Sequence, residues 1–122
     1  MPVEHRFDLA QRIVFCRAWG ALTDHDLQTY QAAVSADPSF DPDLGQLYDG
    51  TGITDLQITS AALVLLLKQT RFAATARRAF VVASDVTFGM ARMYSLLSGH
   101  ESTIRVFRDR ESAIEWLRTG NG

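Results

Sequence analysis

Strand-like segments recur along this 122-residue chain at nearly regular intervals, with helix-like segments between them. After the N-terminal region the strands end near residues 18, 49, 83 and 107, roughly 24 to 34 residues apart. This is the span of a parallel strand–helix–strand unit, in which the helix carries the chain back to the start of the next strand. The pattern predicts an α/β fold with a mostly parallel sheet.

The first two strand-like segments are closer together than the others. Segments 3–8 and 12–19 are rich in β-branched and aromatic residues and have a three-residue link between them, which predicts a β-hairpin. A single domain over residues 1–122 is expected, with an N-terminal β-hairpin, βα repeats, a mostly parallel five-stranded sheet and four helices. The further strands are predicted over 44–50, 77–84 and 103–107, the helices over 23–37, 59–74, 85–99 and 109–120, and a loop over 51–58.

Residues that cap helices stand at the predicted helix starts. Thr23 is followed three residues later by Asp26, in the spacing of a capping box. The remaining expected helix ends are a cap at Thr59 or Ser60, a cap at Asp85 or Thr87, a cap at Asp109 and a stop at Gly120.

The predicted topology leaves one face of the sheet in need of a cover. Crossovers between parallel strands are right-handed, so strands placed side by side in chain order would put every helix on the same face. Val81 and Val82 point to opposite faces, and both are apolar. A partner subunit or an apolar ligand is expected to cover the second face, and a homodimer is predicted.

Composition excludes several classes of protein. The net charge is −2 with both signs interspersed, which argues against nucleic-acid binding. No apolar run approaches the ~18 residues of a membrane span, and the polar N-terminus lacks the apolar core of a signal peptide, so a cytoplasmic location is expected. The single cysteine, Cys16, lies in an apolar run and is interpreted as a buried thiol.

No established catalytic or metal motif is present. Segment 50–55 lacks the third glycine of a dinucleotide loop, and segment 37–43 has two prolines and no glycine, unlike a calcium loop. The histidines, His5, His25 and His100, lack metal-ligand spacing, and the last two are expected to face solvent. We predict no catalytic residues, no metal and no cofactor.

Candidate binding residues follow the predicted strands, because sites in open α/β sheets collect at the carboxyl ends of the strands. Asp49 ends a predicted strand and is either a site carboxylate or a cap for the following turn. Thr59 and Ser60 begin a helix, where backbone amides favour an anion, but simple helix capping is the favoured interpretation of both residues.

A second group of candidates lies in segment 85–99: Asp85, Phe88, Gly89, Met90 and Met93. Gly89 would let a loop, a small ligand or a second subunit approach the backbone. An apolar stripe at helical spacing is interpreted as core, or else as a contact surface or pocket, and consists of Met90, Met93, Tyr94 and Leu97.

These elements and motifs resemble the STAS domain, the SpoIIAA-like fold of bacterial anti-sigma-factor antagonists. Residues 47–67 are similar to the strand, aspartate, loop and serine-capped helix of that family. A closer likeness is to small uncharacterised bacterial STAS/SEC14-like proteins, through the segments 20–27, 37–49, 88–94 and 106–117.

The resemblance implies three alternatives. The favoured one is a non-enzymatic regulatory or interaction module that binds a protein partner or a small apolar ligand. In the antagonists a serine at this turn is phosphorylated, which implies Ser60 here, although Ile58 and Ala61 replace the acidic residue and the glycine of the family turn. SEC14-type proteins carry lipids, which implies a lipid or acyl-chain carrier as the third alternative.

Overall fold

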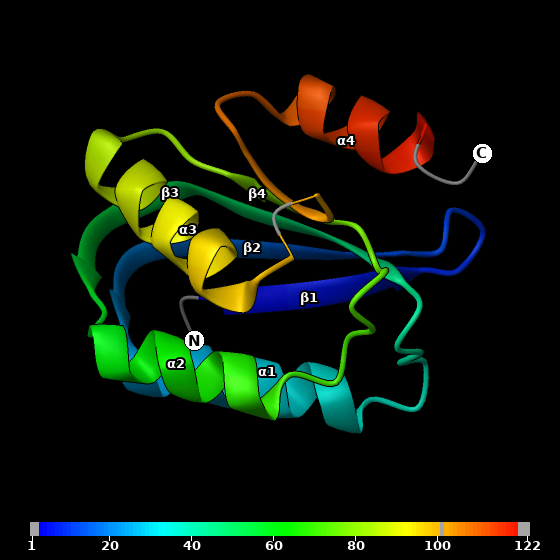
Figure 1. Ribbon diagram of the computed structural model, residues 1–122, viewed down its shortest axis with the longest axis horizontal. Helices are drawn as coiled ribbons and strands as arrows, with labels where there is room; N and C mark the ends of the chain where they lie inside the picture. Colours follow the sequence, from blue (N-terminus) through cyan, green and yellow to red (C-terminus); the bar gives the residue numbers. More distant parts are fainter. Residues whose placement is uncertain (1–2, 101, 120–122) are drawn as a thin grey trace.

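The computed structural model describes residues 3–100 and 102–119 and contains one five-stranded sheet (Figure 1). The strands are β1 (Val3–Asp8), β2 (Ile13–Thr23), β3 (Gly45–Gln57), β4 (Arg78–Val81) and β5 (Ile104–Phe107). They lie side by side in chain order, β1 antiparallel to β2 and all other pairs parallel. The predicted hairpin and mostly parallel sheet are confirmed.

Three helices form the layer on one face of the sheet (Figure 1). They are the crossover helices α1 (Asp24–Ala36), α2 (Ser60–Gln69) and α3 (Asp85–Ser98). Their shared face follows from the right-handed crossover rule, because the strands are in sequential order. The polar and aromatic side chains of β2, β3 and β4 beneath this layer form the site described below.

The fourth helix, α4 (Arg110–Thr119), lies on the opposite face of the sheet (Figure 1). Its Ala113 and Leu117 pack into a cluster with Ile13, Phe15, Leu47, Ala79 and Val81. The expectation that every helix shares one face is therefore wrong. The handedness rule applies to crossovers, and α4 follows the last strand and returns to no other. The chain itself covers much of the face for which a partner was expected.

Segment 51–58 is not a loop as predicted, because β3 continues to Gln57. Beyond the end of the short β4, the sheet continues only as the pair β2 and β3, in which Trp19–Thr23 of β2 pair with Gly52–Gln57 of β3. The register shifts twice here, between Arg17 and Trp19 and between Gly20 and Ala21. Gly20 has φ +69°, a conformation that side chains with a Cβ disfavour. The extended pair curves toward α2 at the left of Figure 1. Its residues Ile53 and Leu56 line the cavity described below.

Several helix ends are as predicted and others differ. Thr23 caps α1 in a capping box with Asp26, Thr59 caps α2, and Asp109 accepts a hydrogen bond from the Ser112 amide in the first turn of α4. The cap of α3 is Ser84, whose side chain exchanges hydrogen bonds with Thr87, and not Asp85 or Thr87. Helix α2 ends at Gln69 instead of residue 74, and the expected stop at Gly120 lies outside the described residues.

Candidate functional site

An apolar cavity of about 110 Å³ lies between the sheet and the three crossover helices. Its walls come from α1, α2 and α3, its floor from β3 and β4, and one end from the curved part of β3. Most of the lining is aliphatic or aromatic, and the described residues contribute no aspartate or glutamate to it. Its volume is of the same order as the roughly 150 Å³ of an engineered apolar cavity that binds benzene.

A chain of hydrogen bonds between buried polar side chains crosses the cavity floor. Strand register explains it, because Gln46 of β3 pairs with Val14 on one side and Arg78 on the other, and all three face the helix layer. The Arg78 Nε donates to Gln46 Oε1 at 3.1 Å, so the amide turns its Nε2 toward Tyr30 Oη, to which it donates. Tyr30 Oη in turn shares a hydrogen bond with Cys16 Sγ.

Arg78 is a buried cation without a carboxylate partner in the part of the chain that the structure describes. The residue is only 7% exposed, yet none of the ion pairs of the described residues includes it. One Nη2–H donates to Tyr94 Oη at 2.8 Å, and the guanidinium lies over the Phe72 ring at 4.8 Å. The guanidinium is thus held by neutral groups alone, whereas buried charges are ordinarily paired.

A second cavity, of about 180 Å³, shares Thr70, Phe72 and Arg78 with the first. It lies beside the carboxyl ends of α2 and α3 and is also lined by residues that include Ser98, His100 and Thr103. Arg78 therefore stands where the two cavities meet.

Tyr48 places an unpartnered hydroxyl at the same site. Tyr48 is only 8% exposed. It lines the first cavity and packs against the rings of Tyr30 and Phe80. Among the described residues, its Oη is the one buried side-chain N or O atom without a hydrogen-bond partner. Burying a hydroxyl without a hydrogen-bond partner costs about 1–3 kcal/mol of folding free energy. No hydrogen bond from a described residue offsets this cost at Tyr48.

Burial keeps the acidic groups of this network protonated. Desolvation raises the pKa of the Cys16 thiol to about 12, and it also raises the pKa of Tyr30 and of Tyr48 above the ordinary tyrosine value. Cys16 is therefore a neutral thiol, as its apolar sequence context predicted, and not a thiolate nucleophile.

Asp49 does not lie at the end of a strand as predicted. It is in the middle of β3, where its Oδ1 accepts hydrogen bonds from the amide and hydroxyl of Thr51 and its Oδ2 pairs with Arg110 of α4 at 3.3 Å. Its neighbours Tyr48 and Gly50 line the cavity, and Asp49 points to the other face. No turn follows Asp49, because β3 continues to Gln57, and its contacts join β3 to α4.

Thr59 and Ser60 lie outside the cavity, at the start of α2. The Asp24 carboxylate accepts hydrogen bonds from the Thr59 amide at 2.9 Å and from its hydroxyl at 2.8 Å, so an acidic group already occupies this helix start. Ser60 is exposed, and its hydroxyl points to Met93 Sδ at 3.9 Å. Its phosphorylation stays a prediction.

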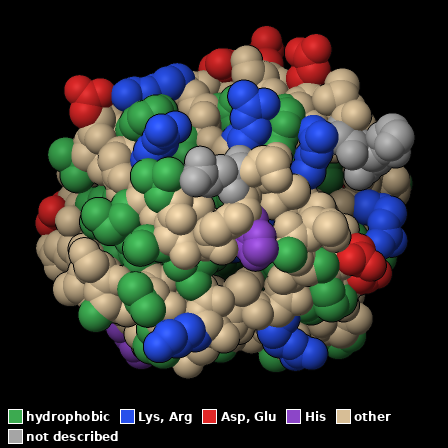
Figure 2. Space-filling model, viewed as in Figure 1, with side chains coloured by type: hydrophobic (Ala, Val, Ile, Leu, Met, Phe, Trp, Pro, Cys, Tyr) green, Lys and Arg blue, Asp and Glu red, His purple; other side chains and the backbone are tan. Residues whose placement is uncertain are grey.

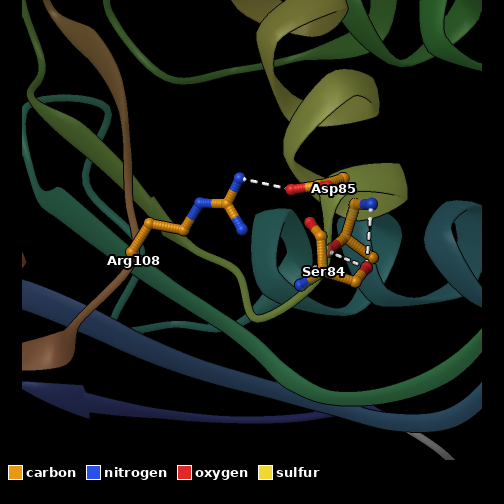
Figure 3. Close-up of polar contacts among 4 residues, drawn as sticks. Ser84, Asp85 and Arg108 are labelled. Carbon is orange, nitrogen blue, oxygen red and sulfur yellow. Dashed lines mark hydrogen bonds and ion pairs between the residues drawn. The ribbon is translucent and has the colours of Figure 1, made fainter.

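Asp85 pairs with Arg108, which follows β5 (Figure 3). Phe88 also contacts Arg108. The Asp85 carboxylate accepts a hydrogen bond from Arg108 Nη2 at 2.9 Å, and the guanidinium lies 4.5 Å from the centre of the Phe88 ring. The side chain of Asp85 is almost fully exposed, so this pair is a surface contact that joins α3 to the end of β5.

The predicted apolar stripe of α3 divides between the cavity and the surface. Tyr94 is buried and Met90 half-buried, and both line the cavity, whereas Met93 and Leu97 are 38% and 51% exposed. A side chain at Gly89 would meet nothing within 4 Å. Of the candidates predicted from the sequence, the cavity therefore contains only Met90.

Four residues that carry the polar chemistry of the cavity were not among the candidates: Tyr30, Gln46, Tyr48 and Arg78. The fifth, Tyr94, was predicted only as part of the apolar stripe. A signal for two of them was present in the sequence. Gln46 and Arg78 each stand in a strand two residues before an aromatic residue, Tyr48 and Phe80, so each shares that residue's inward face. A polar residue on the inward face of a central strand predicts a buried polar group.

Exposed apolar side chains gather over α2 and α3, toward the left of Figure 2. They include Val64, Leu65, Met93, Leu96 and Leu97. A protein partner and a homodimer stay predictions. No helix within the described ranges is long and apolar enough to cross a membrane, and within them no three histidine, cysteine or acidic residues are grouped as metal ligands.

Comparison with known proteins agrees with the fold. A crystal structure of an uncharacterised protein of the DUF3478 family, with a SpoIIAA-like fold, from Shewanella loihica PV-4 matches with a TM-score of 0.62 and 22% identity, covering 94% of this chain and 93% of that one. No curated protein sequence matches. The family described as "Domain of unknown function (DUF7793)" matches residues 8–121. The chain thus has the SpoIIAA-like fold predicted from its sequence and belongs to the DUF7793 family.

Proposed function

We propose that this protein is a non-enzymatic binding module that holds a small apolar molecule in the cavity between its sheet and the crossover helices. The observation that carries the proposal is the apolar lining of that cavity, which includes Leu63, Leu66, Phe80 and Met90. A concave apolar site with a few convergent polar groups is the usual form of a small-molecule site.

The polar groups at the floor support binding rather than catalysis. Their thiol and phenols are kept protonated by burial, as the raised pKa values of Cys16, Tyr30 and Tyr48 indicate. The three histidines lie outside the lining of the apolar cavity, so no imidazole base faces a ligand there. The polar groups would orient a ligand without reacting with it.

The experiment is native mass spectrometry of the freshly purified protein, followed by NMR titration of the ligand-free protein with 1-hexanol. We expect a co-purified small molecule, and shifts confined to amides around the cavity. Ala91 lines the cavity, whereas Ala33 is an exposed residue of α1 that is not part of the lining. The variant Ala91→Leu should weaken hexanol binding at least tenfold by filling space, and the matched variant Ala33→Leu should leave it unchanged.

A wild-type protein that carries no molecule and shows no cavity shifts with millimolar hexanol would contradict the proposal. Equal hexanol binding by both leucine variants would place the binding elsewhere on the molecule.

A further inference from the structure

Arg78 makes the apolar cavity selective for charge. We infer that the ligand is a small amphiphile whose carboxylate head binds Arg78 while its apolar body fills the cavity. This inference rests on the proposed function and adds the chemical class of the ligand to it.

The first support is the unused donor capacity of the guanidinium. An arginine side chain has five N–H donors, and hydrogen bonds to Gln46 and Tyr94 use two of them. The other three have no partner among the described residues, while Arg78 lines both cavities at their junction. A planar guanidinium with free N–H groups at its edge matches the two oxygens of a carboxylate.

The second support is that no described residue supplies a competing acid. Among residues 3–100 and 102–119, no aspartate or glutamate lines either cavity, so an anionic head would meet none of their carboxylates there. The rings of Phe72 and Tyr94, with centres 4.8 and 5.3 Å from the guanidinium carbon, partly compensate the buried cation but supply no anion. A ligand carboxylate would complete the ion pair for which the described residues supply no anion.

The third support is the unpartnered hydroxyl of Tyr48, which lines the same cavity. Tyr48 pairs with Phe80 and Arg78 pairs with Gln46, so Tyr48 and Arg78 are diagonal neighbours on adjacent strands and share the inward face. Tyr48 therefore lines the cavity on the same sheet face as the guanidinium, and its buried Oη keeps a donor that no described residue satisfies.

The charge at the site favours a monoanion. Arg78 is the only buried cation of the lining, because Arg71, the other lining arginine, is exposed and donates to the Ser35 carbonyl at 3.3 Å. One guanidinium balances one carboxylate, whereas a phosphate monoester would bring nearly two negative charges. With a cavity close in size to one that binds benzene, a body of about six carbon atoms is appropriate.

The test compares hexanoate, 1-hexanol and hexyl phosphate as ligands of the full chain, with affinities measured by NMR titration after removal of any co-purified molecule. We expect hexanoate to bind about 10- to 100-fold more tightly than 1-hexanol, as a charged hydrogen-bonded pair in a buried site implies. Hexyl phosphate should bind no more tightly than hexanoate.

Variants identify the group responsible. Arg78→Gln should remove the preference for hexanoate while hexanol still binds. The matched variant Arg92→Gln, at an exposed arginine of α3 outside both cavity linings, should change hexanoate affinity less than about twofold, because exposed charges contribute little. If Arg78→Gln does not fold, Arg78→Lys keeps the charge but loses the planar fork, and it should retain a smaller preference for hexanoate.

The outcomes separate the inference from the proposed function. Equal binding of hexanol and hexanoate, or an unchanged preference in the Arg78 variants, overturns the carboxylate head and leaves an apolar ligand site. Tighter binding of hexyl phosphate replaces the carboxylate with a phosphate and also overturns the inference. Binding of none of the three probes overturns both.

Discussion

At the scale of single residues, the helix-facing side of the sheet combines satisfied and unsatisfied polar groups. Gln46, Tyr30 and Cys16 satisfy one another through a continuous chain of hydrogen bonds. Tyr94 Oη accepts from Arg78, whereas Tyr48 Oη has no partner. The two tyrosines therefore differ in what their hydroxyls contribute to stability, although both rings pack against Phe80.

Replacing each tyrosine by phenylalanine separates these contributions. Tyr94→Phe removes the acceptor of a charged donor and should lower the free energy of unfolding by about 1.5–3 kcal/mol. Tyr48→Phe removes a hydroxyl that is buried without a partner, so it should raise the free energy of unfolding of the ligand-free protein by about 1 kcal/mol. Urea denaturation measures both. A loss of stability in Tyr48→Phe as large as in Tyr94→Phe would show that its hydroxyl has a partner.

At the scale of elements, glycines have opposite effects at two positions. Gly20 lies at φ +69° in the irregular part of β2, where the paired register with β3 shifts. Gly89 is inside α3, and an added Cβ there would meet nothing within 4 Å. Gly20 allows the positive φ that the backbone adopts at this position, whereas Gly89 only lowers the stability of its helix.

We expect Gly20→Ala to lower the free energy of unfolding by about 1–2 kcal/mol, because L-residues disfavour positive φ. We expect Gly89→Ala to raise it by about 0.5–1 kcal/mol through helix propensity. Thermal and urea denaturation of both variants measure the effects. If Gly89→Ala instead weakened the binding of hexanol or of a partner without changing stability, this helix prediction would be wrong. The role of Gly89 would then be to let a ligand or a partner approach the backbone, as expected from the sequence.

The ends of elements show what sequence patterns can predict here. Caps such as Thr23 with Asp26 were predictable, because the capping interaction is local and its partners are three residues apart. The extension of β3 to Gln57 was not, because Gly50, Gly52 and Asp55 are unfavourable in strands and the pairing partner in β2 supplies the stabilisation. The cavity end formed by this extension was missed for the same reason.

At the scale of the molecule, the order of elements determined the layer of crossover helices but not the place of α4. The site could not be predicted from the sequence either. Its floor depends on a contact between Arg78 and Gln46, which are 32 positions apart and meet only when their strands pair. Arginine side chains also complete the α4 face, where Arg6 lies over Phe15 and Arg77 and Arg105 lie over Trp116. The chain has eleven arginines and one lysine, Lys68, and these contacts give a packing reason for that preference.

The covering role of α4 leads to a prediction that compares two leucines. Leu117 of α4 is 3% exposed and packs on the sheet, whereas Leu97 of α3 is 51% exposed. Leu117→Ala should lower the free energy of unfolding by about 2–5 kcal/mol, because it leaves a cavity in a close-packed layer, and Leu97→Ala should change it by less than about 0.5 kcal/mol. Urea denaturation gives both values, and light scattering of the wild type gives the mass against 13.6 kDa for one chain. If Leu117→Ala lowered the free energy of unfolding by less than about 1 kcal/mol and the wild type had twice the mass of one chain, a second subunit and not α4 would cover this face. The reason is that truncating a side chain on a helix that does not pack on the sheet costs little.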